Sequence, residues 1–351
     1  MSHTARRTAV VTLVAGGIVV LALALWKLRL VVGLLFAAAI IAAAMRPGVE
    51  WLYRRRVPRV AGVLLHYVAL VALVAAALWL IVPRALDQVD TALSPGGKQH
   101  IARVAAHSHG IKHDILTALQ SRLQHLPKAS HFIGPAASAG KKAVEIGIGV
   151  FFTFAAAAYW LFERDRVIDL VTGLLPRPKR KVVRDTWQLI DLKLGAFVRG
   201  QLLLILLVAV VLSLRFWLLG EPYWILVGGA GGVLEIVPVI GPLAAGALAV
   251  GVGLTASVHV GVLAAVCVLA VRLVEDYVVM PNVIGESVGL SPLLVLVSVS
   301  AVGILFSGWA VLFAVPIAAV AATLFDVVLR EVDPAEQDVP TVIFSAKEGE
   351  T

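Results

Sequence analysis

Residues 222–330 form an almost unbroken apolar stretch that two helix-breaking signals interrupt, Pro238-Val-Ile-Gly-Pro242 and Pro281-Asn-Val-Ile-Gly285. A chain that crosses a bilayer must satisfy its own backbone hydrogen bonds, so such breaks persist only where protein or a watery cavity surrounds them. Charged groups are costly in the same surroundings. The charged side chains between residues 223 and 325 are nevertheless Glu235, Arg272, Glu275, Asp276 and Glu286. Breaks and carboxylates together predict a pathway for a solute.

The composition places the whole chain in a membrane. Of its 351 residues, 60% are hydrophobic and 15% are charged, whereas globular domains are near one quarter charged. Apolar runs longer than the ~20 residues that cross a bilayer recur along the chain. The formal net charge of +8 does not predict nucleic-acid binding, because the basic residues lie between apolar runs, as topology signals do. The single cysteine, Cys267, excludes a disulfide framework and a thiolate metal site.

We predict an all-α, polytopic transmembrane bundle with about eight spans and one Pro/Gly-broken helical hairpin. The apolar runs occupy residues 9–25, 28–45, 60–82, 143–162, 202–219, 223–254, 258–280, 291–306 and 309–329. The run 223–254 is too long for one ordinary helix, and Pro238 and Pro242 split it into two spans or a re-entrant pair. The first run resembles a cleavable signal peptide, but a spanning helix is favoured because the second run follows almost at once.

Arginine and lysine predict the orientation. The short connection after the second run is crowded with arginines and should be cytoplasmic. These arginines are Arg46, Arg54, Arg55, Arg56 and Arg59. The basic segment 163–199 then also lies inside. Both termini are therefore expected in the cytoplasm, on the inner side of a multi-pass membrane protein.

Five parts of the chain follow from these runs. Residues 1–83 hold spans one to three, and 84–142 form an extramembrane segment with leucines at helical spacing. Residues 143–200 hold span four and cytoplasmic linker helices, and 201–330 form the C-terminal core with the hairpin. Residues 331–351 are an acidic tail that we expect to be disordered. The linker carries an apolar stripe that suits either the membrane surface or the protein's own inner face. The stripe consists of Val183, Trp187, Ile190, Leu194 and Phe197.

The hairpin 231–246 is the first candidate site. Its glycines recur at four-residue spacing, which lets helix backbones pack closely. Pro238 and Pro242 lack amide hydrogens and should leave carbonyls unpaired next to Gly241. Transporters build ion and substrate sites from such carbonyls and helix ends. Glu235 lies one turn away, so we expect a role in the pathway in addition to packing.

A second group lies at the end of the run 258–280. Spacings of three and four residues place Arg272 on the same helical face as Glu275 and Asp276, so an ion pair is expected. At ~1.5 Å per residue these groups lie ~6–12 Å from the helix end. A structural pair in the headgroup zone and a proton or substrate site both remain open.

The complete set of candidates is short. Residues expected to contact solute or ion are Glu235, Pro238, Gly241, Pro242, Arg272, Glu275, Asp276 and Asn282. Structural hinges are expected at Gly285, Pro292 and Pro316. No metal site or cofactor is predicted, because the histidines between residues 100 and 131 lack acidic or cysteine partners at matching spacing. Nucleophile-elbow, zinc-protease and phosphate-loop signatures are absent from the sequence, so we predict a protein that is not an enzyme.

Several motifs, in order along residues 28–330, resemble the autoinducer-2 exporter-like family of bacterial membrane permeases. They are Arg46-Pro-Gly-Val-Glu-Trp-Leu-Tyr53, Phe197-Val-Arg-Gly-Gln-Leu202, Leu219-Gly-Glu-Pro-Tyr223, Glu235-Ile-Val-Pro-Val-Ile-Gly-Pro242, Glu275-Asp-Tyr-Val-Val-Met-Pro-Asn282, Gly289-Leu-Ser-Pro-Leu293 and Val315-Pro316. The resemblance implies an inner-membrane permease of about eight spans, linked in some members to autoinducer-2 export and in others to sodium–proton antiport. A homo-oligomer would also fit the family. Two departures are Val239, where an aromatic is common, and Met45-Arg46, where uncharged residues are commoner.

Our hypothesis is a secondary transporter that exports a small polar solute, in the way that a quorum-sensing exporter releases an autoinducer-2-like signal. Its partners would be the lipid bilayer and the solute, with or without a coupling cation. A sodium–proton antiporter is the first alternative, because the same carboxylates could exchange a proton for sodium. A non-transporting membrane scaffold that recruits a partner through its outer segment is the second.

Overall fold

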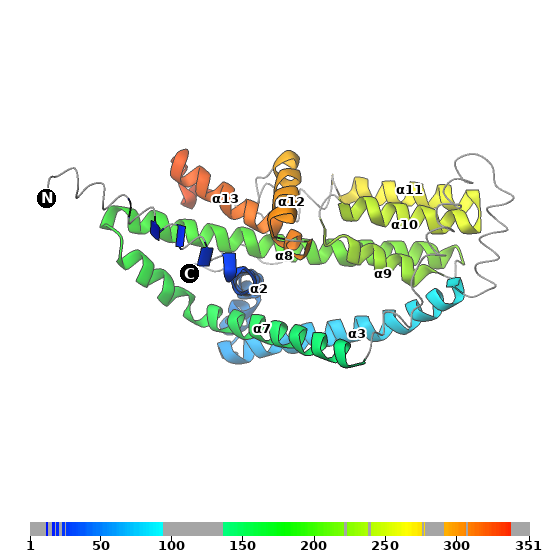
Figure 1. Ribbon diagram of the computed structural model, residues 1–351, viewed down its shortest axis with the longest axis horizontal. Helices are drawn as coiled ribbons and strands as arrows, with labels where there is room; N and C mark the ends of the chain where they lie inside the picture. The colour runs from blue at the N-terminus through cyan, green and yellow to red at the C-terminus, as the bar shows by residue number, and fades with distance from the viewer. Residues whose placement is uncertain are drawn as a thin grey trace.

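The structure is a computed structural model that describes residues 12, 16–17, 19–20, 23–24, 26–93, 136–220, 223–237, 240–275, 277, 291–306 and 308–337. Every regular element in these ranges is a helix, which confirms the predicted all-α class (Figure 1). Most of the first predicted run and the histidine-rich part of the outer segment lie outside the described residues.

One long helix, α8 (Arg177–Leu218), is the axis of the fold (Figure 1). Its 42 residues correspond to ~63 Å at 1.5 Å per residue. It begins after Pro176 and ends before Gly220, whose φ of 72° suits a residue without a Cβ. The predicted linker helix and the apolar run 202–219 are therefore one continuous helix.

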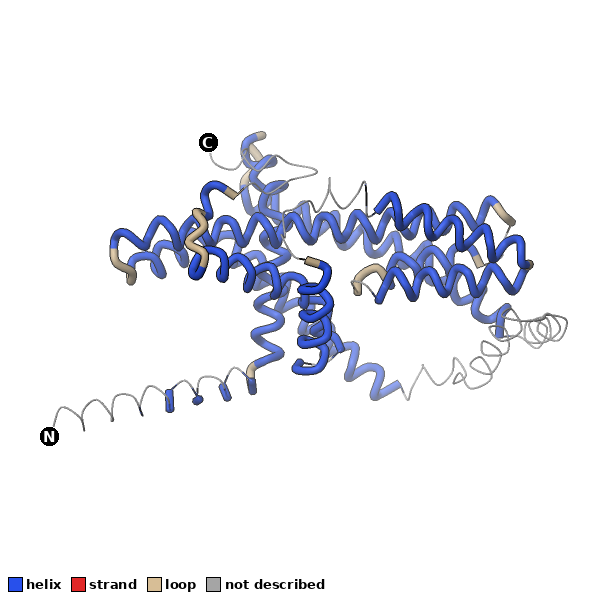
Figure 2. The backbone as a smooth tube through the Cα atoms, turned by 90° about the horizontal axis from the view of Figure 1, so that it is seen from above, coloured by secondary structure: helices blue, strands red, loops and turns tan. Residues whose placement is uncertain are grey.

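The N-terminal helices pack on the first half of α8. α2 (Arg29–Arg54) runs across the long axis, while α3 (Arg59–Leu93) and α7 (Ala136–Gly173) run along it (Figure 2). Small side chains let α2 and α7 approach, as Ala38 and Ala157 share one buried cluster. The linker stripe faces its own protein, because Leu194 is buried against α2 and Trp187 stacks on Trp160 of α7 at 6.0 Å. Of the two alternatives for this stripe, packing against the protein itself holds.

Three shorter helices cover the second half of α8. They are α9 (Trp224–Leu234), α10 (Ile240–Ala256) and α11 (Val258–Val274). The buried cluster of Phe216, Val227, Ala249 and Ala264 takes one residue from each of α8 to α11. Ser257 separates α10 from α11, and its side chain accepts a hydrogen bond from the Val260 amide at 3.1 Å. This cap satisfies one of the free amides at the start of α11.

The C-terminal helices return to the first half of α8. They are α12 (Pro292–Phe306), the 3₁₀ turn η3 (Gly308–Phe313), α13 (Ala314–Leu329) and the short turn η4 (Pro334–Glu336). Pro292 is the first residue of α12 and Pro316 the third of α13, where the missing amide costs no helical hydrogen bond. Both prolines therefore begin helices rather than kink their interiors, and a hinge role for either stays a prediction.

The first residues of the expected disordered tail, 331–337, are described and make defined contacts. Asp333 caps η4 through its side chain, and Pro334 is buried. Gln337 then accepts a hydrogen bond from Lys193 of α8 at 3.0 Å. The tail beyond residue 337 lies outside the described residues.

Among the described residues, which leave out most of the first predicted run, five helical segments are long and apolar enough to cross a membrane. They are Arg29–Arg54, Arg59–Ile81, Val144–Gly173, Arg177–Leu218 and Gly308–Leu329. Of the shorter apolar helices, α9 has 11 residues, or ~16 Å, about half of a ~30 Å hydrocarbon core. By length the α9–α10 pair therefore fits the re-entrant alternative better than two full spans.

Candidate functional site

The turn between α9 and α10 is tight, and most of its described carbonyls are paired. The Val237 amide donates to Leu234 O at 3.0 Å, and the Gly241 amide donates to Val237 O at 2.8 Å. A Cβ at Gly241 would meet the main chain of Leu234 and Glu235, so this turn needs glycine. Gly241 and Pro242 are the second and third residues of α10, so this proline also begins its helix.

Gln201 of α8 holds the turn in place. Its Nε2 donates a hydrogen bond to the main-chain carbonyl of Glu235 at 2.6 Å. The expectation of unpaired carbonyls at the break is therefore wrong for Leu234, Glu235 and Val237. An unmet carbonyl in an apolar surrounding costs free energy comparable to a lost hydrogen bond, and a side chain from α8 removes that cost here.

Glycine-mediated packing in the hairpin is confirmed. A Cβ on Gly232 would lie 2.7 Å from Ala209 Cβ and 2.7 Å from Ile205 O, so α9 contacts the α8 backbone directly. Between α10 and α11, a Cβ on Gly253 would lie 3.1 Å from Gly261 Cα. Small residues at these crossings let helices pack by dispersion contacts in a lipid surrounding.

Two buried carboxyl groups converge near this turn. Glu235 is 5% exposed and Glu275 is 3% exposed. Glu235 lies within electrostatic range of both Arg272 and Glu275. Arg272 Nη1 donates to Glu275 Oε2 at 2.9 Å, which confirms the ion pair expected from the sequence. Three charged groups with a formal sum of −1 thus come from the end of α9 and the end of α11.

The cluster lies at one end of the α8 apolar run, not beside its middle. Gln201 directly precedes the apolar run 202–219. α9 packs antiparallel to α8, with Gly228 near Ala209 and Gly232 near Ile205, so the end of α9 lies near Gln201. The carboxyl groups therefore lie where α8 changes from polar to apolar, as the end of a pathway would require. The other predicted site residues, Pro238, Asp276, Asn282 and Gly285, lie outside the described residues.

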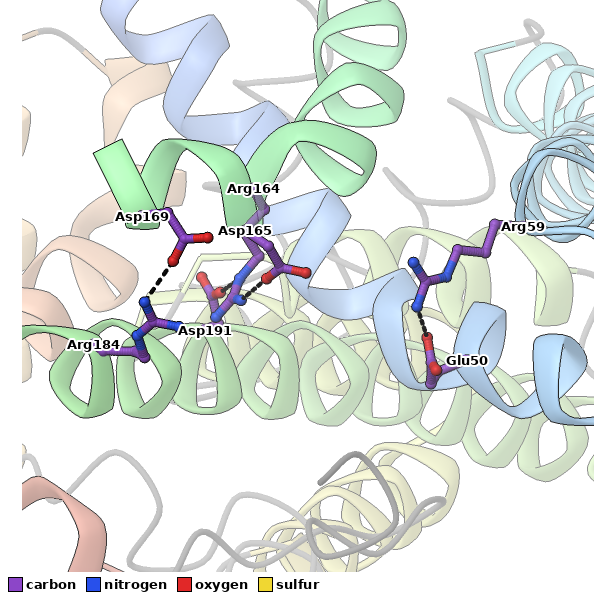
Figure 3. A network of polar contacts seen from close by, with 7 residues as sticks. All are labelled: Glu50, Arg59, Arg164, Asp165, Asp169, Arg184 and Asp191. Atoms are coloured by element: carbon purple, nitrogen blue, oxygen red, sulfur yellow. Dashed lines mark hydrogen bonds and ion pairs between the residues drawn. The ribbon is translucent and has the colours of Figure 1, made fainter. Parts of the chain in front are cut away.

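A second polar cluster, which the sequence reasoning missed, lies between α7 and the first half of α8 (Figure 3). Arg164 of α7 donates from Nε to Asp191 and from Nη1 to Asp165, the latter at 2.8 Å. Arg164 and Asp191 are both buried, whereas Asp165 is exposed. Asp191 follows Trp187 by four residues and precedes Leu194 by three, so a carboxylate within the apolar stripe was the available signal.

The same half of α8 reaches two further elements. Lys193 is buried and donates to Thr323 Oγ1 of α13 at 3.2 Å. Arg199 donates from Nη1 to the carbonyl of Ala44 in α2 at 3.2 Å. Together with Asp191 and Gln201, these residues connect α8 to α2, α7, α13 and the hairpin turn. In the part of the chain that the structure describes, no group of three or more histidine, cysteine or acidic side chains could hold a metal ion.

The geometry can be compared with known proteins. A family model described as "AI-2E family transporter" matches residues 16–330. The chain belongs to this family. The resemblance seen in the sequence motifs is thereby confirmed, and the AI-2E family transporters give the coarse function: a membrane transport protein with several spanning helices.

Relatives of this AI-2E family chain include proteins from a bacterium and an archaeon. It is 25% identical over 294 residues to the "Putative transport protein YrrI" of Bacillus subtilis, covering 82% of this chain and 83% of the relative. It is 24% identical over 295 residues to the "Putative transport protein YueF" of the same organism, covering 80% and 79%. A "Putative transport protein" of Methanothermobacter thermautotrophicus is 24% identical over 266 residues, covering 75% and 78%.

Proposed function

We propose that this AI-2E family transporter is an inner-membrane permease that exports a small polar solute, and that an autoinducer-2-like furanone is the first solute to test. One observation carries the proposal: the ends of α9 and α11 bring Glu235, Arg272 and Glu275 together beside α8. Both termini would lie in the cytoplasm, and the protein would act as a homo-oligomer in the bilayer without a cofactor.

The chemistry of the cluster suits a hydroxylated, carbonyl-containing solute. Carboxylate oxygens accept hydrogen bonds from hydroxyl groups, and a guanidinium donates to carbonyl oxygens. A solute that exchanges its water for these partners loses little hydrogen bonding on entering the protein. Asp276 and Asn282 would add polar side chains to the pathway, and Pro238, Gly241 and Pro242 would shape the turn that it passes. Flux would follow a gradient of solute or ion, as the sequence carries no phosphate-binding loop.

The direct test measures efflux of autoinducer-2 from proteoliposomes. Glu235→Gln and Glu275→Gln should each slow the initial efflux rate at least tenfold, because each removes a charged acceptor from the cluster. Glu163→Gln, an exposed glutamate on α7, is the matched control and should transport like the wild type. Wild-type rates in both cluster variants would remove these residues from the pathway.

A sodium–proton antiporter is the second candidate, favoured by two buried carboxyl groups that share one guanidinium. Such a pair can hold a proton and a cation alternately, because one ionised carboxylate makes ionisation of the other less favourable. The discriminating measurement is the signal of a pH dye inside the liposomes when sodium is added outside. A sodium-driven pH change that Glu235→Gln abolishes, without autoinducer-2 efflux, would select antiport over export.

A further inference from the structure

Arg164 has hydrogen-bond capacity that the described residues do not use. Arg164 is 5% exposed, its Nε donates to Asp191, and its Nη1 donates to Asp165. Its Nη2 is buried and has no hydrogen-bond partner among the described residues. A buried donor left unmet costs free energy, more so on a charged group, so this nitrogen favours an additional acceptor.

A second arginine side chain lies within electrostatic range of Arg164 and its partners. Arg46 of α2 is half-buried and lies within electrostatic range of Arg164, Asp191, Asp165 and Glu50. It forms no hydrogen bond or ion pair within the described ranges, and Glu50 itself pairs with Arg59 at 3.4 Å. Arg46 and Arg164 therefore share one buried carboxylate, Asp191, and Arg164 also pairs with the exposed Asp165, so these four groups have a formal charge of zero.

Both arginines lie just beyond the apolar run of their helix. Arg46 directly follows the run 28–45, and Arg164 follows the run 143–162 by two residues. Asp191 lies eleven positions before the run 202–219 on α8. The ends of apolar runs are where lipid phosphates lie in a bilayer, so a phosphate group is a suitable acceptor here. Asp165, whose side chain is 79% exposed, pairs with Nη1 of Arg164, so one edge of this guanidinium lies near the protein surface.

We propose that Arg46 and Arg164 form a binding site for a single phosphate group between α2, α7 and α8. Guanidinium groups bind phosphate through paired, charge-assisted hydrogen bonds, which suits the unused donors of both arginines. The phosphate would accept hydrogen bonds from the unused donors of both arginines and so join α2 to α7. It belongs either to an anionic lipid headgroup or to a free phosphate ion. The site is separate from the Glu235 cluster and does not depend on which solute is transported.

The test uses the full-length protein in nanodiscs and follows its thermal unfolding midpoint. In phosphatidylcholine discs, sodium phosphate is titrated against sodium chloride of equal ionic strength. A second set of discs contains phosphatidylglycerol in chloride buffer. Bound phosphate should raise the wild-type unfolding midpoint by about 2–4 °C when its concentration is about tenfold above the Kd. A rise with free phosphate identifies the ion as ligand, and a rise only with phosphatidylglycerol identifies the lipid.

Three variants decide the assignment. Arg46→Gln removes one of the two guanidinium groups and should lose the rise in the midpoint. The variant should still fold, because Arg46 forms no hydrogen bond or ion pair within the described residues. Arg184→Gln removes a solvent-exposed arginine that pairs with Asp169 between the same two helices, and it should keep the rise. Asp165→Asn removes a competing carboxylate and should shift the phosphate response to lower concentration. The same response in Arg46→Gln as in the wild type, an unchanged response in Asp165→Asn, or no rise in either disc would overturn the proposal.

Discussion

The side-chain amide of Gln201 donates a hydrogen bond to the main-chain carbonyl of Glu235 at 2.6 Å, across 34 residues of sequence. This contact joins the axial helix to the turn that carries a buried carboxylate. It also explains how a proline-flanked break can exist among apolar helices, since the freed carbonyl finds its partner on a neighbouring helix.

Replacing Gln201 by leucine should loosen the hairpin turn. The buried Glu235 carbonyl then loses its hydrogen-bond donor, at a cost of about 1–3 kcal/mol. We expect a lower thermal midpoint and slower solute efflux in proteoliposomes. Gln188→Leu, a half-buried glutamine on the same helix, is the control and should change neither quantity. Equal behaviour of the two variants would mean that Gln201 does not position the turn.

Replacing Gly232 by valine should separate α9 from α8. The first added carbon already lies 2.7 Å from Ala209 Cβ, so the larger side chain must push the helices apart. Overpacking of this kind costs about 1–3 kcal/mol. The yield of monodisperse protein in size-exclusion chromatography should fall. Gly251→Val is the matched control, because a Cβ on Gly251 of α10 meets no atom within 4 Å. A yield for Gly232→Val as high as for this control would contradict the close approach.

Replacing Lys193 by methionine should release the C-terminal segment. The ammonium group binds Gln337 at 3.0 Å and Thr323 at 3.2 Å, and the methionine keeps the volume without the donors. The thermal midpoint should change little, since the variant also removes a buried charge. Limited proteolysis after Arg330 should become several-fold faster. Lys181→Met, at an exposed position on α8, should leave the cleavage rate unchanged. If both variants are cut at the wild-type rate, Lys193 does not hold this segment.

Local patterns predicted part of the fold and of the site. The helical class, the glycine packing of the hairpin and the Arg272–Glu275 pair depend on spacings within one or two helices, and all three are confirmed. The continuity of α8 was missed because the charged linker looked like a surface helix. Three of its polar residues, Asp191, Lys193 and Arg199, in fact bind groups on α7, α13 and α2.

Gln201 was missed for a different reason. An uncharged amide next to an apolar run has many possible partners, and its actual partner is a main-chain atom that no side-chain pattern marks. The unpaired guanidinium nitrogen of Arg164 is likewise visible only when three helices are assembled. Contacts between distant segments depend on how helices cross, which periodicity along one helix does not determine.

The unbroken course of α8 has a mechanical consequence. Asp191 and Gln201 are ten positions apart on one rigid rod, about 15 Å at the rise of an α-helix. A rod of this kind moves as a unit, so a tilt imposed at its first half displaces the Glu235 turn at the same moment. Phosphate binding at Arg46 and Arg164 would then change the width of the proposed solute pathway at the hairpin 231–246 at the same time, because no hinge in α8 separates the two sites.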